Sequence, residues 1–403
     1  MQKIHILLGL TVLLVGTSIA IGQDVFRFAQ CDPCQPVFSP CDPCGINGGH
    51  YSPFSFGGWF ETGVYTNSHG HRDNGPMHPT SKRRTDFQLN QFNIFAEREM
   101  NTRRGFDWGA RADVVYGTDV DAMWCFGDQT FDYEWGLNRH GYGVSLYQLY
   151  GTLGYKDLSV KVGKFIGYIG WEAAASIDNI FYSRSYCYWI EPATHSGVLA
   201  TYDLSDRLSL SAGWTAGEDA SFRNRYNDST VLSGLALTLF EGATVHYWIN
   251  AGKQGNGNYR GVNRFGDVDI MRNDYFVQSV VLEWDLSKRF TYICQYNLRN
   301  DNFVSAGGTD RISSYGVNNH FLYKLTDKLT AGTRVEWLRD NGSYFVDDAA
   351  EYWQVTLGLR WDATKNVSFR PEVRYDWCND ATPFAGGARS SQVSGGGGMV
   401  ISF

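Results

Sequence analysis

The sequence predicts an all-β fold: a transmembrane antiparallel up-and-down β-barrel of about 16 strands. Apolar and polar residues alternate through most of the chain, and aromatic residues make up 15% of it, beside 45 glycines and only 10 prolines. The chain also ends on Phe403, which closes the alternating stretch Met399, Ile401, Phe403. A terminal aromatic residue is typical of outer-membrane barrels, whose strands end in aromatic girdles. Beyond the N-terminus no apolar run reaches the ~18 residues that a spanning helix needs, so strands would cross the membrane.

Two segments show the expected barrel wall. In residues 106–116 and 367–377, aromatic and aliphatic residues alternate with charged ones. Such strands fit a wall between lipid and water, whereas in a soluble sandwich the apolar faces would need a second sheet. The residues that we expect to line a channel are Asp107, Arg111, Asp113, Lys161, Arg334, Glu336, Arg370, Glu372, Arg374 and Asp376.

The connections between the alternating segments fall into two classes. Short polar turns are expected at residues 156–157, 205–207, 241–242, 287–288, 326–328 and 362–366. Longer connections are expected at residues 66–85, 119–142, 167–196, 217–228, 252–273 and 300–311. Short turns on one side and long loops on the other are the asymmetry of an outer-membrane barrel, so the long loops would face the exterior.

The connection at residues 166–195 is the main candidate for a functional loop, because it is too long for a simple hairpin. Its charged residues, Glu172, Asp178, Arg184 and Glu191, are candidates for a constriction. If the loop enters the lumen, its acids would lie opposite wall cations and create a transverse field. The alternative is an external cap, and the sequence does not give the direction of the loop.

The N-terminal region is expected to divide into a signal peptide at residues 1–22 and a cysteine-rich periplasmic segment at 23–55, before the barrel at 56–403. The segment contains two C-x-x-C pairs, and its cysteines are Cys31, Cys34, Cys41 and Cys44. Disulfides are expected here because the export compartment is oxidising. A zinc site is a weaker alternative, since the six-residue spacer is shorter than the ~15 to 20 residues of common sites. The third alternative is that these cysteines are free or redox-active thiols.

Enzymatic and nucleic-acid functions find little support. The net charge is -7 with no basic block, which argues against nucleic acid as a partner, and Lys82, Arg83 and Arg84 fit a solvated or lipopolysaccharide-facing patch. No metal or other cofactor is expected. His195 and Ser196 could form a hydrolase pair, but adjacent strand residues point to opposite faces. The residues His69, His71, Asp73 and His78 could bind a metal, although a solvated loop fits them better.

The order of several segments resembles a known family. Residues 108–119, 148–172, 179–183, 191–198 and 370–377 resemble the OmpL-like β-barrel porins of porin-2 type. The resemblance covers most of the chain after residue 56 and implies a porin-type channel in a bacterial outer membrane. It implies no particular substrate.

These observations together predict an outer-membrane porin, exported through a cleaved signal peptide, for passive diffusion of small hydrophilic solutes or ions. Its partners would be outer-membrane lipid and the solutes themselves, and assembly as a homotrimer stays open. The first rival is a plugged structural or adhesive barrel that is crosslinked to the envelope through its cysteine-rich leader. The second is a barrel hydrolase.

Overall fold

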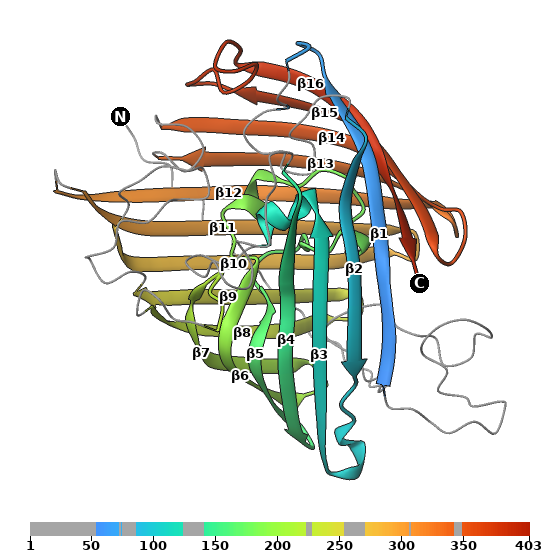
Figure 1. Ribbon diagram of the computed structural model, residues 1–403, viewed down its shortest axis with the longest axis vertical. Helices are drawn as coiled ribbons and strands as arrows, with labels where there is room; N and C mark the ends of the chain where they lie inside the picture. Colours follow the sequence, from blue (N-terminus) through green and yellow to red (C-terminus); the bar gives the residue numbers. More distant parts are fainter. Residues whose placement is uncertain are drawn as a thin grey trace.

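The computed structural model describes residues 54–71, 74, 86–123, 141–222, 228–253, 271–305, 308–341 and 349–403. Its strands form one closed antiparallel transmembrane barrel, in which each strand pairs with its sequence neighbours and β1 closes the ring against β16 (Figure 1). The predicted fold class is therefore confirmed. Closure leaves no unpaired sheet edge, which is the condition for strands to cross a membrane.

Within the described residues the strands of the barrel are β1 (Phe54–Asn67), β2 (Gln88–Arg98), β3 (Phe106–Gly117), β4 (Gly143–Tyr155), β5 (Leu158–Ile166), β6 (Thr194–Ser205), β7 (Leu208–Glu218), β8 (Ser229–Phe240), β9 (Ala243–Lys253), β10 (Met271–Ser287), β11 (Phe290–Ser305), β12 (Gly308–Thr326), β13 (Leu329–Asp340), β14 (Ala350–Asp362), β15 (Val367–Cys378) and β16 (Ser391–Ser402). The helical segments are η2 (Thr102–Arg104), η3 (Thr118–Ala122), η5 (Ser176–Asp178) and α1 (Tyr186–Trp189). No helix in the described part of the chain is long and apolar enough to cross a membrane.

The alternation in the sequence becomes two faces of the wall, because successive strand residues point to opposite sides. On β15, Val373 and Tyr375 are 57% and 44% exposed, whereas Arg374 between them is fully buried. On β3, Val114 and Tyr116 are exposed and Asp113 is buried. The apolar residues therefore face lipid, and the charged residues face the interior of the barrel.

The two ends of the barrel differ as expected. The chain enters β1 and leaves β16 at the end that carries the short turns, where the amide of Gly58 donates to the carbonyl of Phe403 at 2.9 Å. One expected long loop is wrong: residues 300–311 lie mostly in β11 and β12, which continue until Ser305 pairs with Gly308. Polar residues do not end these strands, because their backbone groups still pair across the hairpin.

Within the described residues the interior of the barrel holds three apolar clusters, the smallest of which joins Trp59 and Val400 to Ala175. The first joins α1 to side chains of β3, β4, β13 and β14, including Val115, Tyr147, Leu338 and Tyr352. The second joins the β5–β6 connection to β5, β6, β8, β9 and β10, and its largest buried side chain is Trp248. All three clusters contain residues of the β5–β6 connection, so that segment organises the interior.

Candidate functional site

The connection between β5 and β6, residues 167–193, lies inside the barrel, and we call it the inward loop (Figure 1). It reaches strands far from its own ends. Gln91 on β2 donates to the carbonyl of Ala174 at 2.8 Å, and Arg370 on β15 donates to the carbonyl of Ser176 at 2.6 Å. The direction that the sequence leaves open is thus inward.

Arginines of the wall bind backbone carbonyls of the inward loop. Besides Ser176, Arg370 donates to the carbonyl of Asn179 at 3.1 Å, and Arg374 donates to the carbonyl of Arg184 at 2.6 Å. A guanidinium offers five donors in a fixed plane, so one side chain can satisfy several carbonyls that no regular element pairs. These buried arginines fix the path of the loop.

Carboxylates of the wall bind backbone amides of the same loop. Glu336 accepts from the amides of Tyr186 and Cys187 at 2.7 and 2.6 Å. These two residues begin α1, and the first amides of a helix have no partner within it. Glu372 accepts from the amide of Tyr182 at 2.8 Å. Acids that alternate with the arginines along the wall therefore supply the complementary half of the loop's hydrogen bonds.

One ion pair joins the loop to the wall directly. Glu172 lies 2.6 Å from Arg334 of β13, and both side chains are buried. Burial alone would raise the pKa of Glu172, but attraction to Arg334 and His320, with a hydrogen bond from the amide of Ser185, lowers this pKa to about 2. Glu172 is therefore ionised at neutral pH.

Glycines of the wall receive two aromatic side chains of the loop. A Cβ at Gly332 or Gly358 would lie 2.9 Å from the ring of Phe181, and a Cβ at Gly398 would lie 2.7 Å from the ring of Tyr182. Contacts under 3 Å are not tolerated in packed interiors, so only glycine admits these rings without a shift. We call these glycine positions, which receive an aromatic ring of the loop, glycine sockets. They could not be recognised in the sequence, because glycines occur in strands for many other reasons.

The remaining loop candidates differ in exposure. Arg184 and Glu191 are buried, and the carboxylate of Glu191 accepts from the side-chain amides of Gln295 and Asn297. Burial raises the pKa of Glu191 well above its usual range. Asp178, at the end of η5, is exposed.

The wall of β2 to β5 keeps charged residues that do not bind the loop backbone. Arg111 lies 2.7 Å from Asp113 and 2.8 Å from Glu97, and it is partly exposed. Lys161 on β5 is also partly exposed and donates to the hydroxyl of Tyr168 at 2.6 Å.

The last two predicted wall residues, Asp107 and Asp376, lie at different depths. Asp107 is near the short turn, where it pairs with Arg98 at 2.9 Å, so it sits at the rim. Asp376 of β15 accepts from the hydroxyl of Tyr186 at 2.5 Å and belongs with the residues that hold the loop.

Comparison with known proteins agrees with this architecture. The family described as "Putative beta-barrel porin-2, OmpL-like" matches residues 53–403. The chain belongs to this family. The chain is thus an outer-membrane porin of the OmpL-like family, and no curated protein matches it.

Solved structures of similar fold share little sequence with this porin. OmpF of Salmonella typhi in complex with daunomycin is 15% identical, with a TM-score of 0.57, over 87% of this chain and 97% of that one. The outer-membrane channel DcaP of Acinetobacter baumannii is 12% identical, with a TM-score of 0.56 and the same coverage. The anion-selective porin of Comamonas acidovorans is 10% identical, with a TM-score of 0.55, over 87% and 99% of the two chains. These likenesses support the fold.

Several candidate catalytic and metal-binding residues of this porin make structural contacts. Ser196 and His195 are both buried, and the hydroxyl of Ser196 donates to the carbonyl of Ala220 at 2.6 Å. A ring nitrogen of His69 lies 2.7 Å from the carbonyl oxygen of Ser391. Among the described residues no group of His, Cys, Asp and Glu side chains could hold a metal.

Among the described cysteines, Cys187, Cys294 and Cys378 are free thiols. The predicted residues that lie outside the described part are Cys31, Cys34, Cys41, Cys44, Asp73, His78, Lys82, Arg83 and Arg84, with the signal peptide.

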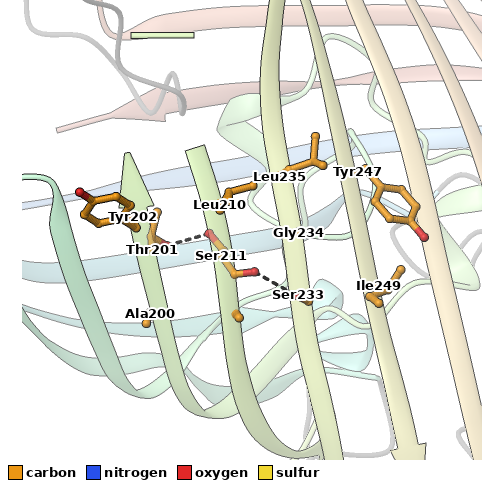
Figure 2. Close-up of a pocket in the computed structure, with 11 residues that line it drawn as sticks. Ala200, Thr201, Tyr202, Leu210, Ser211, Ser233, Gly234, Leu235, Tyr247 and Ile249 are labelled. Carbon is orange, nitrogen blue, oxygen red and sulfur yellow. Dashed lines mark hydrogen bonds between the residues drawn. The ribbon is translucent and has the colours of Figure 1, made fainter. Parts of the chain in front are cut away.

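A groove of about 490 Å³ lies over β6 to β9 (Figure 2). Its lining includes the small residues Ala200 and Ala212, with Leu210 and Tyr202, which are 39% and 47% exposed. By strand alternation these side chains share the outer face of the porin. The groove therefore faces lipid and does not belong to the lumen.

Proposed function

We propose that this porin is a passive channel for small hydrophilic solutes or ions, narrowed by the inward loop. The observation that carries the proposal is the dense set of hydrogen bonds between the loop and the charged wall, including those of Arg334 and Glu372. A loop held in this way reduces the lumen without blocking the strand pairing that closes the barrel. Selectivity then follows from the width and charge of the remaining path.

The path that we propose runs between the loop and the wall of β2 to β5. Arg111 and Lys161 are partly exposed on this wall, and Asp178 is exposed on the loop. Arg111 lies near enough to act electrostatically on the carboxylate of Asp178. Opposite charges across a narrow, low-dielectric passage create a transverse field that orders ions and dipolar solutes.

The expected lining residues divide by role in this proposal. Six of them hold the loop in place, and they are Arg334, Glu336, Arg370, Glu372, Arg374 and Asp376. Arg111 and Lys161 border the path, Asp113 is buried against Arg111, and Asp107 belongs to the rim. Charges that are paired and buried beneath the loop act weakly on a solute, because their fields are neutralised locally.

Liposome swelling with neutral sugars of increasing size tests the channel. Liposomes containing the porin should swell with monosaccharides, and more slowly as solute size grows. The plugged structural barrel is the second candidate, because the apolar cluster that includes Val115, Tyr147 and Leu338 bridges opposite walls. Folded, inserted protein that admits no sugar and no salt would favour the plugged barrel.

A further inference from the structure

Lys161 projects into the barrel interior among aromatic rings. Its ammonium lies 4.4 Å from the ring centre of Tyr150 and 5.3 Å from that of Tyr168, and it donates to the Tyr168 hydroxyl at 2.6 Å. Thr152 lies directly opposite Lys161 on β4, so its hydroxyl shares the same face of the wall. Lys161 as a whole residue is partly exposed, on the face of β5 that lines the interior.

Lys161 differs from the neighbouring cation in its pairing. Arg111 is paired with two carboxylates, those of Glu97 and Asp113. Among the described residues no carboxylate lies within ion-pair distance of Lys161. An ammonium has three donors, and the Tyr168 hydroxyl takes one of them. The aromatic faces stabilise the positive charge without neutralising it.

We propose that Lys161 is a binding subsite for the oxyanion of a passing solute, a carboxylate or a phosphate. The remaining ammonium donors form charge-assisted hydrogen bonds to the oxyanion, and Thr152 adds a hydroxyl donor beside them. The rings of Tyr150 and Tyr168 contact an organic portion of the solute, as aromatic residues do in ligand sites. This subsite would define the class of solute that the proposed channel carries. Its role in transport rests on the proposed function.

Equilibrium binding to the full chain in detergent tests the subsite without requiring conductance. Sodium benzoate is titrated by calorimetry, with benzyl alcohol as the neutral ring of similar size and inorganic phosphate as an oxyanion without a ring. Replacing Lys161→Met should weaken benzoate and phosphate binding about tenfold or more, the effect of losing a charged hydrogen bond. The matched control is Lys288→Met, which removes the same charge from an exposed turn and should bind as the wild type does. Lys161→Arg should restore most of the affinity.

Two results would overturn the subsite. One is equal binding of benzoate and benzyl alcohol to the wild-type chain, which needs no variant to fold. The other is benzoate affinity in a folded Lys161→Met chain equal to that of the Lys288→Met control. A chain that binds benzoate through Lys161 but passes no solute would refute the channel and leave the subsite standing. A conducting chain that fails both binding comparisons would refute only the subsite.

Discussion

The carboxylate of Glu172 and the guanidinium of Arg334 form an ion pair of 2.6 Å inside the barrel, and both side chains are buried. Glu172 comes from the inward loop and Arg334 from β13, so this pair bridges 162 positions of sequence. Each charge is neutralised by the other, and little of either field reaches the lumen. Glu172 therefore anchors the loop, whereas the exposed Asp178 is the residue that we propose acts on ions.

Replacing Glu172→Gln should loosen the loop. The change leaves Arg334 buried without its counter-charge, and such a loss costs about 3 to 5 kcal/mol. The barrel should still fold, because its closure depends on strand pairing. Limited proteolysis should then cut the inward loop of the variant faster than that of the wild type.

The control for this change is Asp178→Asn, which removes an acid from the same loop at an exposed position. This variant should keep the wild-type rate of proteolysis while its reversal potential in a salt gradient shifts toward anions. If Glu172→Gln shifted the reversal potential and left proteolysis unchanged, the anchoring role would be wrong.

Filling a glycine socket should displace the loop from the wall. In Gly358→Ala the new Cβ would lie 2.9 Å from the ring of Phe181, and overpacking of this kind costs about 1 to 3 kcal/mol. The matched control is Gly151→Ala on β4, where the nearest atom to the new Cβ lies 3.9 Å away. Faster loop proteolysis in Gly358→Ala alone is expected, and equal rates in both variants would contradict the socket.

Acid should release the loop only at very low pH. The pKa of Glu172 falls from an ordinary value of 4.5 to about 2 because Arg334 and His320 outweigh the raising effect of burial. A lowered pKa in the folded state means that the ion pair contributes fully above about pH 4.5 and is lost as the pH falls through about 2. Tryptophan fluorescence and loop proteolysis against pH should therefore show docking retained at pH 4. Release near pH 5 that is absent in Glu172→Gln would contradict this assignment.

A charged substitution should lower the folding stability of the barrel on its lipid-facing side more than on its lumenal side. Val373 is 57% exposed to lipid, and Val373→Arg should cost about 2 to 4 kcal/mol near the middle of the membrane. Thr201 neighbours the lipid-exposed Tyr202 on β6, so its side chain points to the lumenal face, and Thr201→Arg should fold almost as the wild type does. Urea titration of folding into liposomes compares the two. Equal tolerance would be inconsistent with this orientation of the wall.

Much of the wall could be predicted from the sequence, because strand alternation leaves a direct signal. The expected lumenal positions Arg370, Glu372 and Arg374 do point inward, and their neighbour Val373 points outward. The lengths of the loops were predicted less accurately from the sequence. Residues 300–311 look like a loop by composition, yet their backbone pairing extends β11 and β12 to Ser305 and Gly308.

The inward loop could not be placed from the sequence. Glu336 and Glu372 look like acids of an open lumen, and only the folded chain reveals that loop amides reach them. The glycine positions that receive loop aromatics could not be predicted for the same reason, since Gly358 on β14 meets Phe181, a residue far away in the sequence. Such contacts depend on the path of one irregular segment, and irregular segments have no periodicity from which a path could be predicted.

The central claim is that the barrel conducts and that the inward loop sets the width of the path. Single-channel recording in planar bilayers tests it most directly, with the wild type compared with a variant in which a short glycine-serine linker replaces residues 170–191. We expect discrete conductance steps from the wild type, and larger steps with weaker ion preference from the shortened chain, which still closes its barrel. Folded and inserted wild-type protein that gives no steps, or a shortened chain with unchanged conductance, would contradict this claim.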